Sequence, residues 1–292
     1  MPDAPERSVP PRELRDHLLS HGRSSITLQD AASILRLDPG AASDALVRLR
    51  RRGQFFSPHR GMYVPIPPEY REWHAVPAMD FIDQLMQVMG REYYVGLLSA
   101  AEVHGAAHQR PQVFQVMVDK PVVDRDFGRV RLRFYTKQHL EAVPTVPMNS
   151  RTAVVCVSSP AATVLDLVQR PNDCGGLSNV ATILGELAED GKLAAEELVD
   201  AATAFPLAAL RRVGWLLDFL ETDVPTEPLA AALRARAGHP ETDPAPAGRP
   251  GRDGRQDSEG RAAVLLSAGG PRRGRSDEHW GVVINTVVEP DL

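Results

Sequence analysis

Hydrophobic positions in the N-terminal part of the chain recur with helical spacing. Ala42, Ala45, Leu46 and Leu49 fall at i, i+3, i+4 and i+7, which predicts one apolar stripe along a helix. Asp38 is suited to cap this helix, Pro39 to its first position and Gly53 to its exit, so we expect a helix over about residues 39–52.

Two shorter helices are predicted before it, over about residues 10–20 and 28–36. Thr27 and Asp30 have the spacing of a capping box at the start of the second one. After Gly53, "QFFS" and "MYVPI" read as short strands joined by "PHRG". Helix, helix, turn, helix and hairpin is the order of a winged helix-turn-helix, which we expect over residues 1–68.

A proline-rich linker separates this unit from a second pattern, in which helical and strand-like stretches mix. "VFQVMV" and "RVRLRFY" predict strands, "TAVVCV" a buried strand, and the stretches up to about residue 220 mostly helices. The sequence therefore predicts an α+β protein: a winged helix-turn-helix followed by a larger mixed domain over residues 76–292.

The end of the chain changes composition. Residues 237–279 are rich in glycine, proline and arginine, which predicts a loop with little capacity to build a core. Residues 280–288 then alternate like a strand, and we expect them to pair with the sheet of the second domain. No apolar run approaches about 18 residues and the N-terminus lacks a secretory pattern, so we expect a cytoplasmic protein without membrane contact.

The charge of the chain is unevenly distributed, and one short segment near the N-terminus is basic. The whole chain has a net charge of −5 and a pI near 6.0, yet residues 36–61 hold six arginines against two aspartates. A basic patch on an acidic protein indicates an anionic partner for that patch alone.

The predicted helix–hairpin arrangement explains the arginines as DNA contacts. In a winged helix the third helix lies in the major groove, where arginine binds guanine bidentately, and the hairpin approaches the backbone. The alternative is a solvated helix end, since cations stabilise helix C-termini. The candidate DNA-binding residues are Ser43, Asp44, Arg48, Arg50, Arg51, Arg52, His59 and Arg60.

The sequence patterns that could indicate a catalytic site are less specific than the pattern that indicates DNA binding. His104 and His108 lie four residues apart near Glu102, but no HExxH is present, and we interpret them as structural. Asp119-Lys120 after a strand, and Glu189 to Lys192, only partly match nuclease patterns. We therefore expect no enzyme activity, no metal and no cofactor.

Two cysteines complete the candidate chemistry. Cys156 sits in an apolar run, which predicts a buried small side chain, and Cys174 sits in a turn-like stretch. The pair favours a reducing compartment, although two cysteines are also enough for one disulfide.

Several stretches in order resemble the AbiEi-type antitoxins of type IV toxin–antitoxin systems. These stretches are "RRRGQFFSPHRGMYVP", "YYVGLLSAAEVHGAAHQRPQVFQVMVDKP", "LRRVGWLLDFL" and "HWGVVINTVVEPDL". They cover most of the chain, and it is their order along the chain, more than any single stretch, that is specific for this family.

The resemblance implies an autorepressor linked to phage defence. Its winged helix would bind inverted repeats of double-stranded DNA in the operon's own promoter, and Ser43, Arg48, Arg51, Arg52 and Arg60 match the recognition-helix and wing positions. The C-terminal domain would counter a nucleotidyltransferase-like toxin without a stable complex. We expect a monomer in solution and two copies on DNA.

Two other functions stay open from the residues alone. One is a transcriptional regulator whose second domain binds a small effector. The other is a nuclease-like enzyme brought to DNA by the winged helix, which would need a cluster of acids and a lysine.

Overall fold

The structure is a computed structural model, and it describes residues 9–107, 111–237 and 263–291. The chain divides into two compact units that interleave along the sequence. The first unit comprises Met1–Tyr94, Gln112–Gln138 and Pro147–Cys156, and the second comprises Val95–Pro111, His139–Val146 and Val157–Leu292.

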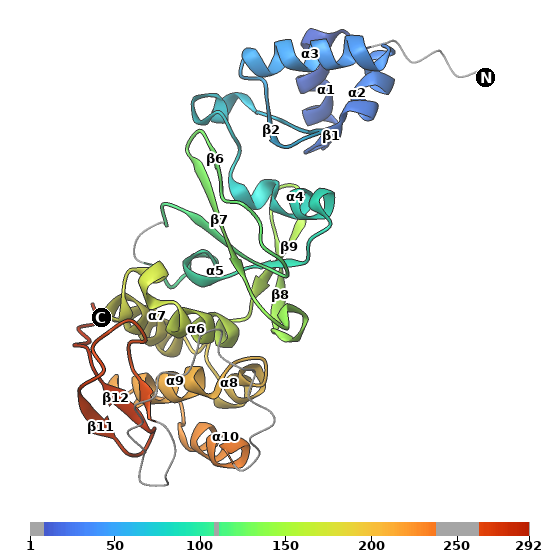
Figure 1. Ribbon diagram of the computed structural model, residues 1–292. Coiled ribbons are helices and arrows are strands. Elements are labelled where there is room, and N and C mark those ends of the chain that lie inside the picture. The colour runs from blue at the N-terminus through green and yellow to red at the C-terminus, as the bar shows by residue number, and fades with distance from the viewer. Residues whose placement is uncertain (1–8, 108–110, 238–262, 292) are drawn as a thin grey trace. The chain divides into compact units, whose positions relative to one another are not determined.

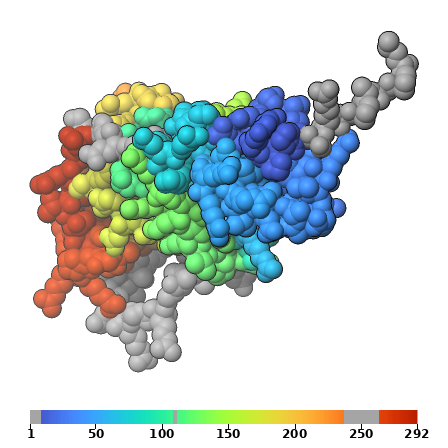
Figure 2. Space-filling view, turned by 90° about the horizontal axis from the view of Figure 1, so that it is seen from above, coloured from blue at the N-terminus to red at the C-terminus, as the bar shows by residue number. Residues whose placement is uncertain are grey.

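The first unit begins with three helices and a small antiparallel sheet (Figure 1). A 3-10 turn, η1 (Pro11–Glu13), leads into α1 (Leu14–Ser20), α2 (Leu28–Leu35) and α3 (Pro39–Arg51). Strands β1 (Ile26–Thr27), β2 (Phe55–His59) and β3 (Met62–Pro65) form a sheet in the order β1-β3-β2. The predicted winged helix-turn-helix order is confirmed, with β1 as an added strand. Figure 2 shows the surface of these helices in blue.

Local capping explains where these helices begin. The Thr27 side chain accepts a hydrogen bond from the Asp30 amide at 3.1 Å, and the Asp30 carboxylate accepts one from the Thr27 amide at 2.9 Å. Asp38 accepts from the amides of Gly40 and Ala41. Both caps satisfy N–H groups that the first helical turn leaves unpaired.

The rest of the first unit is built on strands. It contains η2 (Pro68–Trp73), η3 (Ala78–Asp80), α4 (Ile82–Met89), β5 (Phe114–Val118), β6 (Arg125–Phe127) and β7 (Val130–Thr136). β5 pairs with β7 in parallel and β6 pairs with β7 as an antiparallel hairpin. With β4 (Tyr93–Val95), β8 (Thr145–Asn149) and β9 (Val154–Ser158), they form a six-stranded sheet in the order β6-β7-β5-β4-β9-β8. This mixed architecture confirms the predicted α+β class.

The second unit is mostly helical and is organised around α6. Every residue from Ala161 to Val168 is buried, because α5, α7, α8 and α9 all pack against this helix. The helical elements are α5 (Leu97–Val103), η4 (Leu140–Ala142), α6 (Pro160–Gln169), η5 (Pro171–Cys174), α7 (Leu177–Glu189), α8 (Ala195–Ala202), α9 (Leu207–Phe219) and α10 (Glu227–Ala237).

The C-terminal strand differs from its prediction. β12 (Val282–Ile284) is shorter than the expected 280–288, and it pairs with β10 (Val264–Leu265) and β11 (Arg275–Asp277) in a separate sheet. The expected pairing with the larger sheet is wrong, because β12 finds both its partners within the glycine-rich stretch that precedes it. β10 and β11 lie in the described part of that stretch, and residues 238–262 lie outside the described residues.

Trp280 fixes this small sheet to α9. The Trp280 indole nitrogen donates a hydrogen bond to the Asp218 carboxylate at 2.6 Å, and its ring is buried against Gly214. A Cβ at position 214 would collide with the indole, so glycine is required there for close approach. The Arg212 guanidinium adds a hydrogen bond to the Leu265 carbonyl at 2.9 Å.

The two cysteines are free, and the predicted burial of Cys156 is wrong. Cys156 is exposed and Cys174 is buried. β9 alternates exposed and buried residues from Val154 to Val157, so Cys156 falls on the open face. The apolar run around Cys156 therefore does not mark a strand that is covered on both faces. Separately, no helix among the described residues has the length and apolarity needed to cross a membrane.

Candidate nucleic-acid interface

The α3 helix presents two faces with different roles. Ala42, Ala45, Leu46 and Leu49 are buried in the core that this helix shares with α1 and α2, as the apolar stripe predicted. This packing turns the opposite face, with its charged residues, away from the core.

The predicted DNA-binding residues are mostly exposed. Asp44, Arg48 and the arginines that follow are exposed on α3 and its C-terminus, Ser43 is half-buried, and in the wing His59 is half-buried beside exposed Arg60. Five of the predicted DNA-binding arginines have no ion-pair or hydrogen-bond partner among the described residues. They are Arg48, Arg50, Arg51, Arg52 and Arg60. Unpaired guanidinium groups carry their full charge to an incoming anion.

The wing between β2 and β3 has a compact tip. The Ser57 hydroxyl donates to the His59 carbonyl at 2.8 Å, and the His59 imidazole Nδ1 lies 3.0 Å from the Arg60 carbonyl. The pairing register shifts between Phe56 and His59, and Gly61 has a φ of 83° at the turn. The bulge and the glycine together shape the tip that carries Arg60.

The wing is also held from outside the winged helix. The Phe56 ring contacts Phe81 edge-on with 5.2 Å between centroids, and Phe127 of β6 with 5.6 Å. The Arg125 guanidinium donates to the Pro58 carbonyl at 2.9 Å. The β6–β7 hairpin therefore supports the wing, and the first unit includes both.

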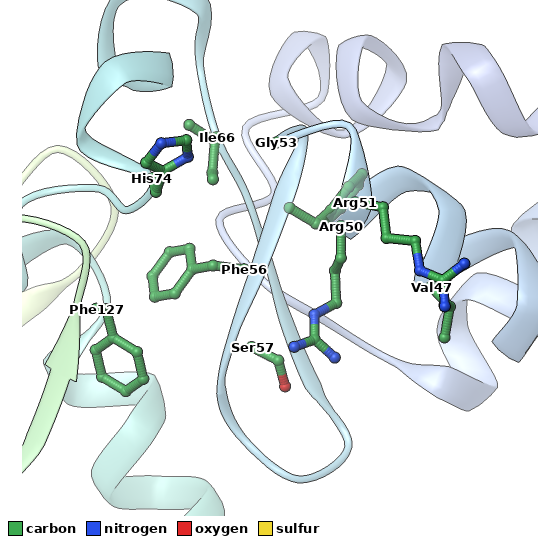
Figure 3. A pocket seen from close by; sticks show the side chains of 10 residues that line it. Val47, Arg50, Arg51, Gly53, Phe56, Ser57, Ile66, His74 and Phe127 are labelled. Carbon is green, nitrogen blue, oxygen red and sulfur yellow. The ribbon is translucent and has the colours of Figure 1, made fainter.

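A cleft of about 470 Å³ opens beside α3 and the wing (Figure 3). It brings together two of the predicted DNA-binding residues, Arg50 and Arg51, whereas Ser43, Asp44 and Arg48 do not line it. Its more distant members could not be predicted from the sequence, since no local pattern links them to α3. The lining residues are Val47, Arg50, Arg51, Gly53, Phe55, Phe56, Ser57, Ile66, His74 and Phe127.

Two of the groups considered for catalysis in the second unit, His104 and Lys192, have hydrogen-bond partners. His104 Nε2 lies 2.7 Å from the Ser158 carbonyl, and the Lys192 ammonium donates to the His104 carbonyl and to Asp190, each at 2.7 Å. His108 lies outside the described residues. Within the described residues, no group of three or more His, Cys, Asp or Glu side chains is placed to hold a metal ion.

Burial shifts the pKa values of His104 and Asp80 in opposite directions. Desolvation lowers the pKa of His104, and the nearby Lys192 charge lowers it further, against the hydrogen bond to Ser158. Desolvation raises the pKa of Asp80, which the Arg151 charge only partly offsets. His104 and Asp80 both lie outside the cleft lining, and the Asp80 carboxyl accepts a hydrogen bond from the Arg151 amide at 3.3 Å.

Comparison with known proteins identifies part of the chain. Residues 94–219 match the AbiEi antitoxin C-terminal domain family. The predicted resemblance to AbiEi-type antitoxins is therefore confirmed for this segment. A comparison with curated proteins gave no match.

Among solved structures, the chain is similar to the RV2827C protein from Mycobacterium tuberculosis. The TM-score is 0.61, with 15% sequence identity over 97% of this chain and 94% of that chain. At this identity the likeness shows a shared fold.

Proposed function

We propose that this protein is the antitoxin of a type IV toxin–antitoxin system and represses its own operon. The winged helix binds inverted repeats in the promoter, one protein copy on each repeat. The AbiEi domain neutralises a nucleotidyltransferase-like toxin without forming a stable complex with it.

One observation carries the DNA-binding half of this proposal. The exposed arginines at 48, 50, 51 and 52 share the end of α3, and Arg60 is exposed at the wing tip. A recognition helix supplies base contacts and a wing supplies backbone contacts in winged-helix proteins. The charge of this region stands out on a chain whose net charge is −5.

The antitoxin half rests on the AbiEi domain match over residues 94–219. In the second unit, His104 and Lys192, two of the groups considered for catalysis, are engaged in hydrogen bonds that join separate elements. This arrangement favours a protein that acts by binding over one that acts as a nuclease.

A second candidate is a transcriptional regulator controlled by a small effector. The cleft beside α3 favours it, because a ligand there would lie next to the recognition helix. An effector site and an antitoxin domain are compatible in one chain, so this candidate does not exclude the first.

Titration of the full chain onto its own upstream DNA at several salt concentrations tests the DNA-binding half. Log affinity should fall linearly with log salt, and each lost phosphate contact should reduce the slope by about 0.9. Arg48→Ala and Arg51→Ala should each weaken binding, while Arg272→Ala, an exposed arginine in the second unit, should not. Equal affinity for unrelated DNA, or equal binding by all three variants, would contradict the proposal.

The antitoxin half needs a separate test. Coexpression with the proposed nucleotidyltransferase-like toxin should restore growth, and a pull-down of the two purified proteins should recover no complex. Rescue by a stable complex would contradict the type IV mechanism and leave the antitoxin role in place.

A further inference from the structure

The cleft beside α3 and the wing has the size and lining of a small-molecule site. Its volume of about 470 Å³ falls within the usual range for ligand clefts, about 300–1,000 Å³. Its walls come from separate parts of the first unit: the end of α3, the strand β2, the segment from Ile66 to His74 that follows β3, and Phe127 at the end of β6.

One side of the cleft is cationic. Arg50 and Arg51 reach it from α3, and neither guanidinium has an acidic partner among the described residues. A guanidinium binds a phosphate, carboxylate or sulfonate group through paired N–H donors. In Figure 3 the Arg50 side chain extends toward Ser57, so its charge lies beside the strand that forms the cleft wall.

The other side is aromatic. Phe56 and Phe127 line it, with their ring centroids 5.6 Å apart. Phe127 is only half-buried, so part of its ring stays open to a ligand. An open phenyl ring favours a planar ring in offset or edge-on contact. His74 adds a hydrogen-bonding imidazole to the same cleft.

We propose that this cleft binds a small organic anion that carries a planar ring, of the chemical class of the nucleoside monophosphates. The anionic group binds Arg50, whose guanidinium extends toward Ser57, and the ring packs against the half-buried Phe127. An inorganic anion would leave the aromatic side uncovered, and an uncharged ring would leave the guanidinium groups unpaired.

The site has a regulatory consequence that rests on the proposed DNA binding by α3. Arg50 and Arg51 belong both to the cleft and to the charged end of α3. An anion bound there neutralises charge that would otherwise face DNA phosphates, so ligand and DNA compete. The ligand therefore acts as an inducer of the operon.

Calorimetric titration of the full chain without DNA tests the site. The probes are AMP, GMP, CMP and UMP, with adenosine as a ring without charge and inorganic phosphate as charge without a ring. At least one nucleotide should bind about tenfold more tightly than both controls, as expected for losing a charge-assisted hydrogen bond or a ring contact.

Variants locate the binding. Arg50→Gln and Phe127→Leu should each weaken nucleotide binding several-fold, whereas Arg48→Gln, on the same helix but outside the cleft lining, should leave it unchanged. Arg50 is exposed, so its variant keeps the test valid even where Phe127→Leu loses stability. No nucleotide binding, equal binding of phosphate alone, or binding that is equal in all variants would overturn the proposal.

A second titration separates this proposal from the proposed function. Adding the bound nucleotide should raise the Kd for promoter DNA in the wild-type protein. Nucleotide binding by a chain that has no affinity for DNA would remove the DNA-binding role and keep the site. DNA binding by a chain that binds no nucleotide would remove the site and keep the DNA-binding role.

Discussion

The phenyl rings of Phe56 in the wing and Phe127 in the β6–β7 hairpin lie 5.6 Å apart, centroid to centroid. The neighbouring Phe55 is buried in the core of the three N-terminal helices instead. Successive side chains of a strand point to opposite faces, so β2 joins two apolar clusters. The wing is therefore part of the winged helix and of the sheet region that follows it.

Phe56→Ala should destabilise the first unit by about 3–5 kcal/mol, the usual cost of removing a buried phenyl ring. The reason is that Phe56 is buried against both Phe81 and Phe127. Chemical unfolding of the full chain measures this cost. The control is Val123→Ala at an 80% exposed side chain, which should change stability by less than about 0.5 kcal/mol. Equal effects of the two variants would show that the aromatic cluster contributes little.

Gly214→Ala should destabilise the second unit by about 1–3 kcal/mol, as overpacking does. The added methyl collides with the buried Trp280 ring that fixes β12 to α9. Thermal unfolding measures the loss, and Trp280 fluorescence should report a displaced indole. In a Gly214→Ala/Trp280→Ala double variant the methyl should cost little beyond the Trp280→Ala change alone. If the losses of the Gly214→Ala and Trp280→Ala variants simply added up in the double variant, the methyl would not collide directly with the indole.

Stability should depend on pH through His104. Its pKa is lowered in the folded chain, so the unfolded chain binds more protons between the folded pKa and about 6.5. This contribution to the unfolding free energy is complete above about pH 6.5 and is lost as the pH falls toward the folded pKa. His104→Gln should have a flatter profile than the wild type in urea unfolding between about pH 7.5 and 5.5. His139→Asn, at an exposed histidine, should keep the wild-type slope.

Cys156 should react with iodoacetamide in the native protein, and Cys174 should not. Cys156 is exposed on β9, whereas burial protects Cys174 and raises its pKa, which disfavours the reactive thiolate. Mass spectrometry after brief alkylation should find the adduct on Cys156 alone, and on both cysteines once the chain is unfolded in urea. Native labelling of Cys174 would show that η5 opens readily.

Thr27→Ala should cost about 1 kcal/mol, because it removes the capping hydrogen bond to the Asp30 amide. Thr27→Ser keeps the hydroxyl acceptor and should stay close to the wild type. The capping hydrogen bonds also lower the pKa of Asp30, first through the Thr27 amide. The stability from this group is present above the ordinary aspartate pKa of about 3.9 and falls as the pH drops through the lowered value. A loss in Thr27→Ser equal to that in Thr27→Ala would contradict the capping role.

The sequence by itself determined the elements whose signals are local. Asp38 with Pro39 sets the start of α3, and Thr27 with Asp30 sets the start of α2, because capping is decided within one helical turn. The spacing of Ala42, Leu46 and Leu49 likewise determined which face of α3 is buried, and so which arginines are exposed.

Only the tertiary structure decided what lies far apart in the chain. The apolar neighbours of Cys156 predict a buried side chain, but its exposure depends on which strands and helices cover each face of β9. The pairing of β12 with β10 and β11 depends on non-local hydrogen bonds that leave no pattern in residues 280–288. His74 and Phe127 join Arg50 in one cleft because the β6–β7 hairpin supports the wing. Such contacts join residues that follow no local spacing rule, so the hydrophobic periodicity of the sequence does not predict them.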